Sequence, residues 1–64
     1  MDLKERLEIE LNNMKAEAER CSDLAYKNFL ATNFRMYHVW DSRANAFKDC
    51  IAIIEECIKE TNKN

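Results

Sequence analysis

The sequence predicts an all-α protein: an antiparallel hairpin of two long helices that assembles into a helical-bundle oligomer. Three observations lead to this prediction. The 64 residues contain no glycine and no proline, the residues on which tight turns and hairpin strands depend. Apolar residues recur with helical spacing in two runs that are separated by one break. The second run is wider than the first, so the first helix leaves part of it uncovered.

Length and composition predict one helical domain over residues 1–64. A domain of this size buries only about 60% of the surface of its unfolded chain, so we expect oligomerisation to stabilise it. The cysteine count of three is odd and no secretory segment precedes the cysteines, which argues against a disulfide framework. The longest apolar run, residues 50–54, is too short to span a bilayer. We therefore expect a reduced, cytoplasmic protein with no membrane partner.

The first helix is expected over about residues 2–30. Asp2 is a typical N-cap residue, and Glu5 follows at the spacing of a capping box. A single apolar stripe then runs along the helix: Leu3, Leu7, Leu11, Met14, Ala18, Cys21, Ala25 and Phe29. The stripe is narrow, closer to a coiled-coil seam than to a wide globular face. It has the width to cover one row of side chains on a neighbouring helix.

The periodicity breaks at Ala31, Thr32 and Asn33, and we place the turn at about residues 31–33. Threonine and asparagine are cap residues, and asparagine tolerates the left-handed backbone that ends many helices. Ser22 and Asp23 form a competing break, which would divide the chain into three helices. A short connection at 31–33 would make the two helices antiparallel neighbours.

The second helix is expected over about residues 34–61 and carries two apolar rows. The first row contains Met36, Trp40, Ala44, Phe47, Ile51, Ile54 and Ile58. The second row, about 100° further round the helix, contains Val39, Arg43, Ala46, Cys50, Ile53 and Cys57. Only one row finds a partner inside the chain. We therefore expect Val39, Ala46, Cys50, Ile53 and Cys57 to form a homo-oligomer interface. All three cysteines are expected to be buried small hydrophobic residues.

Positive charge and aromatic residues gather in the middle of the chain. Residues 20–48 carry a net charge of +3, against -3 for residues 1–19 and -2 for residues 49–64, and all six aromatic residues lie within 20–48. Cations bind phosphate and flat rings stack on nucleobases. We therefore expect an anionic nucleotide ligand, contacted by Tyr26, Lys27, Arg35, Tyr37 and Arg43. Solvated surface or an oligomer rim is the alternative for these five residues. Phe29, Trp40 and Phe47 fall on the apolar stripes and are expected in the core.

No motif predicts catalysis, a cofactor or a metal site. His38 faces away from the apolar rows and is expected at the surface. Cys50 and Cys57 face one way on the second row, but zinc would need two further ligands from another copy. Cys21 and His38 lie on different helices and different faces, which argues against a nucleophilic Cys–His pair. We therefore expect a binding protein rather than an enzyme, with no cofactor.

The run from Trp40 to Phe47, followed by Ile51, Ile53, Ile54, Glu55 and Glu56, resembles the C-terminal helix of many very short phage early proteins. In those helices the residue order is often an aromatic residue, a small residue, a basic residue, Ala, any residue, Ala and an aromatic residue. A row of aliphatic residues with acidic residues follows. Ser42 stands where many of them have glycine. The resemblance covers about the last third of the chain. It implies a phage-encoded antagonist of host defence: a helical oligomer that sequesters cyclic nucleotide signals (the anti-CBASS sponge type), an anti-CRISPR protein or a host-takeover protein.

Three hypotheses for function follow. The first is a non-enzymatic oligomeric binding protein, a phage antagonist of bacterial immunity that sequesters a cyclic nucleotide in the host cytoplasm. The second is a small helical inhibitor that docks its second apolar row on a host protein. The third is a binder of single-stranded nucleic acid, which the acidic ends of the chain disfavour.

Overall fold

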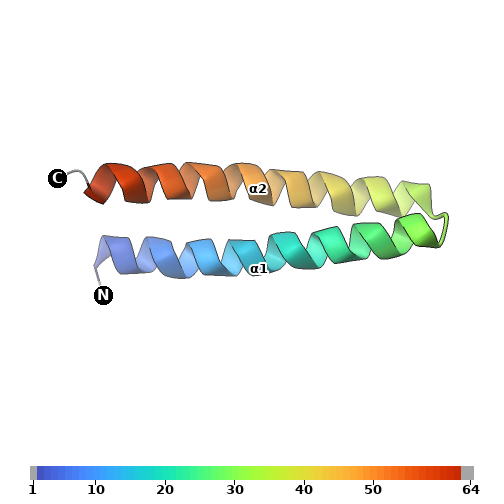
Figure 1. The fold of residues 1–64 in the computed structure, drawn as a ribbon, viewed down its shortest axis with the longest axis horizontal. Coiled ribbons are helices and arrows are strands. Elements are labelled where there is room, and N and C mark those ends of the chain that lie inside the picture. Colours follow the sequence, from blue (N-terminus) through green and yellow to red (C-terminus); the bar gives the residue numbers. More distant parts are fainter. Residues whose placement is uncertain (1, 63–64) are drawn as a thin grey trace.

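The computed structural model describes the backbone of residues 2–62 and the side chains of residues 2–60, and these residues form a two-helix hairpin. Helix α1 spans Leu3–Leu30 and helix α2 spans Phe34–Asn62. Figure 1 shows the helices antiparallel and side by side, with the turn at one end of the molecule and the start of α1 and the end of α2 at the other. The predicted all-α hairpin is confirmed. Ser22 and Asp23 lie inside α1, so the three-helix alternative is wrong.

The hairpin is a thin rod. Its principal extents are 49 × 17 × 11 Å and its radius of gyration is 14.7 Å. A compact domain of this length would have a radius of gyration of about 11 Å. The accessible surface is 4932 Å², whereas a typical folded monomer of this mass exposes about 4300 Å². One chain therefore buries unusually little of itself.

Helix α1 begins at a side-chain cap. Asp2 has an extended backbone, and its Oδ1 accepts a hydrogen bond of 2.8 Å from the backbone N–H of Glu5. This bond satisfies one of the N–H groups that the first turn of a helix leaves without a partner. The cap that the sequence predicts at Asp2 is confirmed.

The turn is a Schellman motif built without glycine. Thr32 adopts a left-handed backbone with φ of 58°. Its N–H donates to the carbonyl of Phe29 at 3.0 Å, and the N–H of Asn33 donates to the carbonyl of Asn28 at 2.8 Å. The left-handed residue is therefore threonine rather than asparagine. The side chain of Asn33 accepts instead from the N–H of Met36 at 3.4 Å, a long cap for α2.

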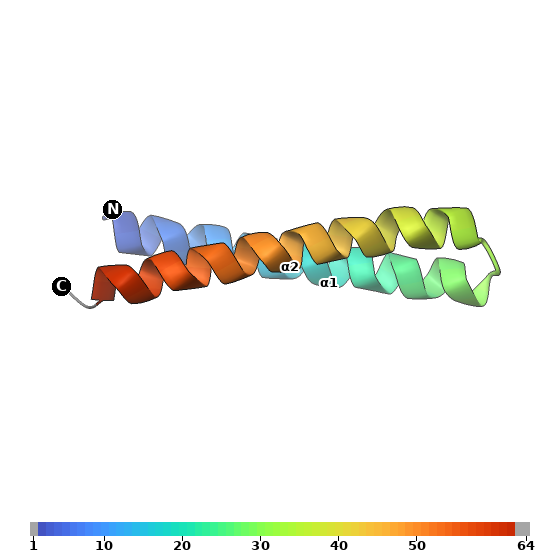
Figure 2. The same ribbon diagram turned by 90° about the horizontal axis from the view of Figure 1, so that it is seen from above.

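Small side chains make the contact between the helices. The buried residues are Ala18, Cys21 and Ala25 on α1 and Ala44 on α2. Cys21 and Ala44 are each 1% exposed. Figure 2 shows the two helices crossing along the middle of the rod. Small residues let the helix axes approach closely there, and larger residues on either side are only half-buried.

The two apolar rows of α2 differ in burial. The contact row faces α1 and is half-buried or better, apart from Met36 at the turn end; it consists of Met36, Trp40, Ala44, Phe47, Ile51, Ile54 and Ile58. The outer row is exposed throughout and consists of Val39, Arg43, Ala46, Cys50, Ile53 and Cys57. The prediction that Cys50 and Cys57 are buried is therefore wrong within one chain, because α1 covers only the contact row. The prediction for Cys21 is confirmed.

Neither helix, over the residues described, is both long enough and apolar enough to cross a membrane.

A candidate ligand pocket near the turn

A pocket opens between the helices near the turn. Ser22, Ala25, Tyr26 and Phe29 line it from α1, and Tyr37 and Asp41 line it from α2. The α1 residues follow the i, i+3, i+4, i+7 spacing of one helix face, and the α2 residues are four apart. The cavity measures about 300 Å³ and is open to solvent. This volume lies at the lower end of small-molecule sites and is large enough for one ring system.

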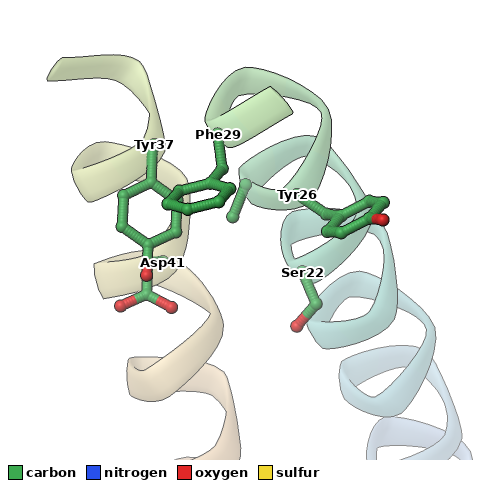
Figure 3. Close-up of a pocket in the computed structure, with 6 residues that line it drawn as sticks. Ser22, Tyr26, Phe29, Tyr37 and Asp41 are labelled. Carbon is green, nitrogen blue, oxygen red and sulfur yellow. The ribbon is translucent and has the colours of Figure 1, made fainter. Parts of the chain in front are cut away.

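Aromatic rings form the wall of the pocket nearest the turn. The Phe29 ring lies edge-on to Tyr37, with centroids 5.5 Å apart, and to Phe34, at 5.8 Å. Each such pair contributes about 0.5–1.5 kcal/mol beyond the area it buries. Figure 3 shows the Phe29 and Tyr37 rings together between the helices and the Tyr26 ring apart from them on the α1 side. Phe29 is 50% exposed and Tyr26 is 63% exposed, so both present ring surface to a ligand.

The exposure of Phe29 corrects a prediction. The apolar stripe predicts Phe29 in the core, but the stripe reaches the turn at this residue, where the α2 rings of Phe34 and Tyr37 cover Phe29 only in part. Trp40 and Phe47, the other two predicted core rings, are half-buried.

The polar groups of the pocket are a hydroxyl and a carboxylate. Figure 3 shows Ser22 and Asp41 below the rings, on the two helices that flank the opening. A carboxylate accepts hydrogen bonds only, and a serine hydroxyl both donates and accepts. The six lining residues include no lysine or arginine. Rings with a carboxylate suit a flat ligand that presents N–H donors, or an organic cation, better than they suit a bare phosphate.

The structure separates the five predicted ligand residues. Tyr26 and Tyr37 come from different helices and share the pocket. Lys27, Arg35 and Arg43 are exposed and are not among its lining residues. The two tyrosines thus line the same cavity, and the three cations lie outside it.

Arg43 takes part in a separate cluster on Trp40. Its guanidinium carbon lies 4.9 Å from the centre of the Trp40 ring, and that of Arg20 lies at 5.7 Å. Arg20 also donates two hydrogen bonds to Glu17, at 2.9 and 3.2 Å, and this carboxylate raises the pKa of Arg20 above its usual value. Both guanidinium groups therefore make cation–π contacts with the Trp40 ring.

The sequence reasoning missed Ser22, Phe29 and Asp41 as pocket residues. Helical spacing was the available signal, because Ser22 lies four residues before Tyr26 and Asp41 lies four residues after Tyr37. The rotation of the two helices about their axes, which decides that these pairs face each other, is not contained in that spacing.

The cysteines and His38 form no recognisable chemical centre. Among the described residues, no three of the types His, Cys, Asp and Glu are grouped so that they could hold a metal ion. Cys21 is buried in the helix contact, whereas His38 is exposed beside Tyr37, with ring centres 5.1 Å apart.

The chain matches no protein-family model, and no curated protein or solved structure is significantly similar to it.

Proposed function

We propose that the protein is a non-enzymatic binding protein that takes the base of a nucleotide into the pocket near the turn. The observation that carries the proposal is that Tyr26 and Phe29 from α1 and Tyr37 from α2 all line one open cavity. Base stacking on an aromatic side chain contributes about 1–3 kcal/mol. The Asp41 carboxylate adds an acceptor for N–H groups at the edge of a base.

The phosphate groups of the ligand would lie outside the pocket. Residues 20–48 carry a net charge of +3, which attracts an anion toward the turn end at long range. Lys27 and Arg35 would then act by steering rather than by direct contact. Sequestration of a cyclic nucleotide signal of bacterial immunity, which the resemblance to phage proteins implies, is the biological role that we propose for such binding.

Calorimetric titration with a panel of cyclic di- and oligonucleotides and matched mononucleotides tests the proposal. We expect Tyr26→Ala to weaken binding of the best ligand about tenfold or more through loss of stacking. Since Tyr26 is largely exposed, the variant should keep its helical circular dichroism.

Ile9→Ala is the matched control, because Ile9 is an exposed side chain outside the pocket. It should leave the affinity unchanged. Lys27→Gln and Arg35→Gln should weaken binding less than Tyr26→Ala and should flatten its salt dependence. The absence of heat and of a thermal shift across the whole panel would end the proposal.

The exposed outer row supports a second candidate, a helical inhibitor that docks on a host protein. The row presents apolar side chains at helical spacing, as helices that bind in grooves do. This function requires a monomer in solution that captures one defined partner, with capture lost in Ile53→Asp. A stable homo-oligomer by light scattering would contradict it.

A further inference from the structure

The outer row of α2 contributes no residue to the pocket. Its six residues are exposed, and Ile53 is 64% exposed. Each residue advances about 100° around a helix, which places Tyr37 and Asp41 on one side of the contact row and the outer row on the other. The row and the pocket therefore lie on different faces of the hairpin, and a partner on the row would leave the pocket open.

The outer row is centred on the middle of its helix. Residue 48 is the midpoint of Phe34–Asn62. Ala46 and Cys50 lie equally far from it on either side, as do Arg43 and Ile53, and Val39 and Cys57. The row runs for about 27 Å. A second copy of α2 would cover its full length in either direction: antiparallel about a two-fold axis at residue 48, or parallel with each residue beside its own copy.

Arg43 decides between these directions. In a parallel pair it would lie beside the partner's Arg43, and like charges side by side are unfavourable. In an antiparallel pair the two arginines are about 15 Å apart along the axis. Each then lies at the level of the partner's Ile53, away from the partner's Arg43.

The overall charge distribution favours the same direction. Residues 20–48, around the turn, carry +3, and the two terminal segments together carry -5. The segment around the turn and the described parts of the terminal segments lie toward opposite ends of a rod 49 Å long. An antiparallel pair places the basic turn end of each copy beside the acidic end of the other. A parallel pair places the two basic ends side by side and the two acidic ends side by side. Complementary charge of this kind fixes the orientation of partners.

We propose that two copies of the protein pair antiparallel along the outer row, with their turns at opposite ends and their pockets facing outward. The surface of one chain is about 600 Å² larger than that of a typical monomer of its mass, and a standard dimer buries about 800 Å² per partner. The excess is thus of the size that such a pair would cover. The pairing is independent of the proposed nucleotide binding, because it uses a different face.

Disulfide mapping tests the orientation. The double variant Val39→Cys, Cys50→Ser has two cysteines in the outer row, at positions 39 and 57. Mild oxidation and peptide mass spectrometry should recover a disulfide between 39 of one copy and 57 of the other. Within one chain these positions are about 27 Å apart along α2, beyond disulfide reach. Disulfides of 39 with 39 and 57 with 57 as the main products would overturn the proposal in favour of a parallel pair.

Cys50→Ser alone is the matched control, because it keeps Cys57 as the cysteine of the row. Antiparallel pairing separates the two copies of this residue by about 27 Å, so we expect no covalent dimer. Sedimentation of the unmodified protein is a measurement that needs no substitution. A dimer is expected, and a monomer at micromolar concentration would overturn the proposal whatever the variants do.

Discussion

The two rows of α2 share a helix, a spacing and an apolar character, and they differ in what covers them. The contact row packs on α1 around Ala44, which is 1% exposed, whereas the outer row has Ile53 at 64% exposed. The difference arises from α1, whose single narrow apolar stripe covers one row only. Apolar spacing therefore predicts that a row will be buried, but the partner helix decides whether this happens within one chain or between chains.

The largest expected effect comes from a charge placed in the contact row. Ala44→Asp puts a carboxylate in the buried contact between the helices, where Ala44 is 1% exposed, and an uncompensated buried charge costs about 3–5 kcal/mol. A chain of this size has little stability to lose. We expect the variant to be largely unfolded by far-ultraviolet circular dichroism.

Ala46→Asp makes the same chemical change two residues further along the helix, at an exposed position of the outer row. Its helical content should match that of the unchanged protein. If both variants unfold alike, the distinction between the two rows is wrong.

A charge in the outer row should have a smaller effect, and on assembly rather than on folding. Burying an isoleucine side chain contributes about 1.5–3 kcal/mol, and the dimer would bury Ile53 of both copies. Ile53→Asp should therefore raise the dissociation constant of the dimer at least about 100-fold. Sedimentation velocity over a range of concentrations measures this change.

Ile9→Asp is the matched control for Ile53→Asp, because Ile9 is an exposed isoleucine on α1, outside both rows. The control should keep the dimer. An equal loss of assembly in both variants would mean that added charge, and not the outer row, controls association.

The sequence predicted most of the fold because the signals are local. Spacings of three and four residues define the helices and separate the two rows, and Asp2 caps α1 where a cap residue was recognised. The sequence did not predict which residue of the turn adopts the left-handed backbone. Asn33 is the better residue for that conformation, but its side chain caps α2, so the conformation falls on Thr32.

The pocket could be predicted only in part. The sequence predicts Tyr26 and Tyr37 as ligand-contacting residues, and both line the cavity. Asp41 and Phe29 were missed, since their place in the pocket depends on how the helices are rotated and on where α2 ceases to cover α1. The clustering of charge along the sequence also does not predict that Arg43 lies on Trp40 and outside the pocket.

The smallest expected effect lies at the turn, and it tests whether folding and assembly are separate. A left-handed backbone costs a residue with a Cβ about 1–2 kcal/mol, and glycine avoids this cost at some expense in unfolded-state entropy. Thr32→Gly should therefore raise the free energy of unfolding by about 0.5–1 kcal/mol. Thr32→Ala retains the Cβ, so its free energy of unfolding, measured by chemical denaturation, should rise little.

Because the turn lies in neither row, the dissociation constant of the dimer should stay the same in both variants. A glycine variant that is more stable but dissociates more readily would show that the strained turn sets the angle at which α2 presents its outer row, so that the two rows would not act independently.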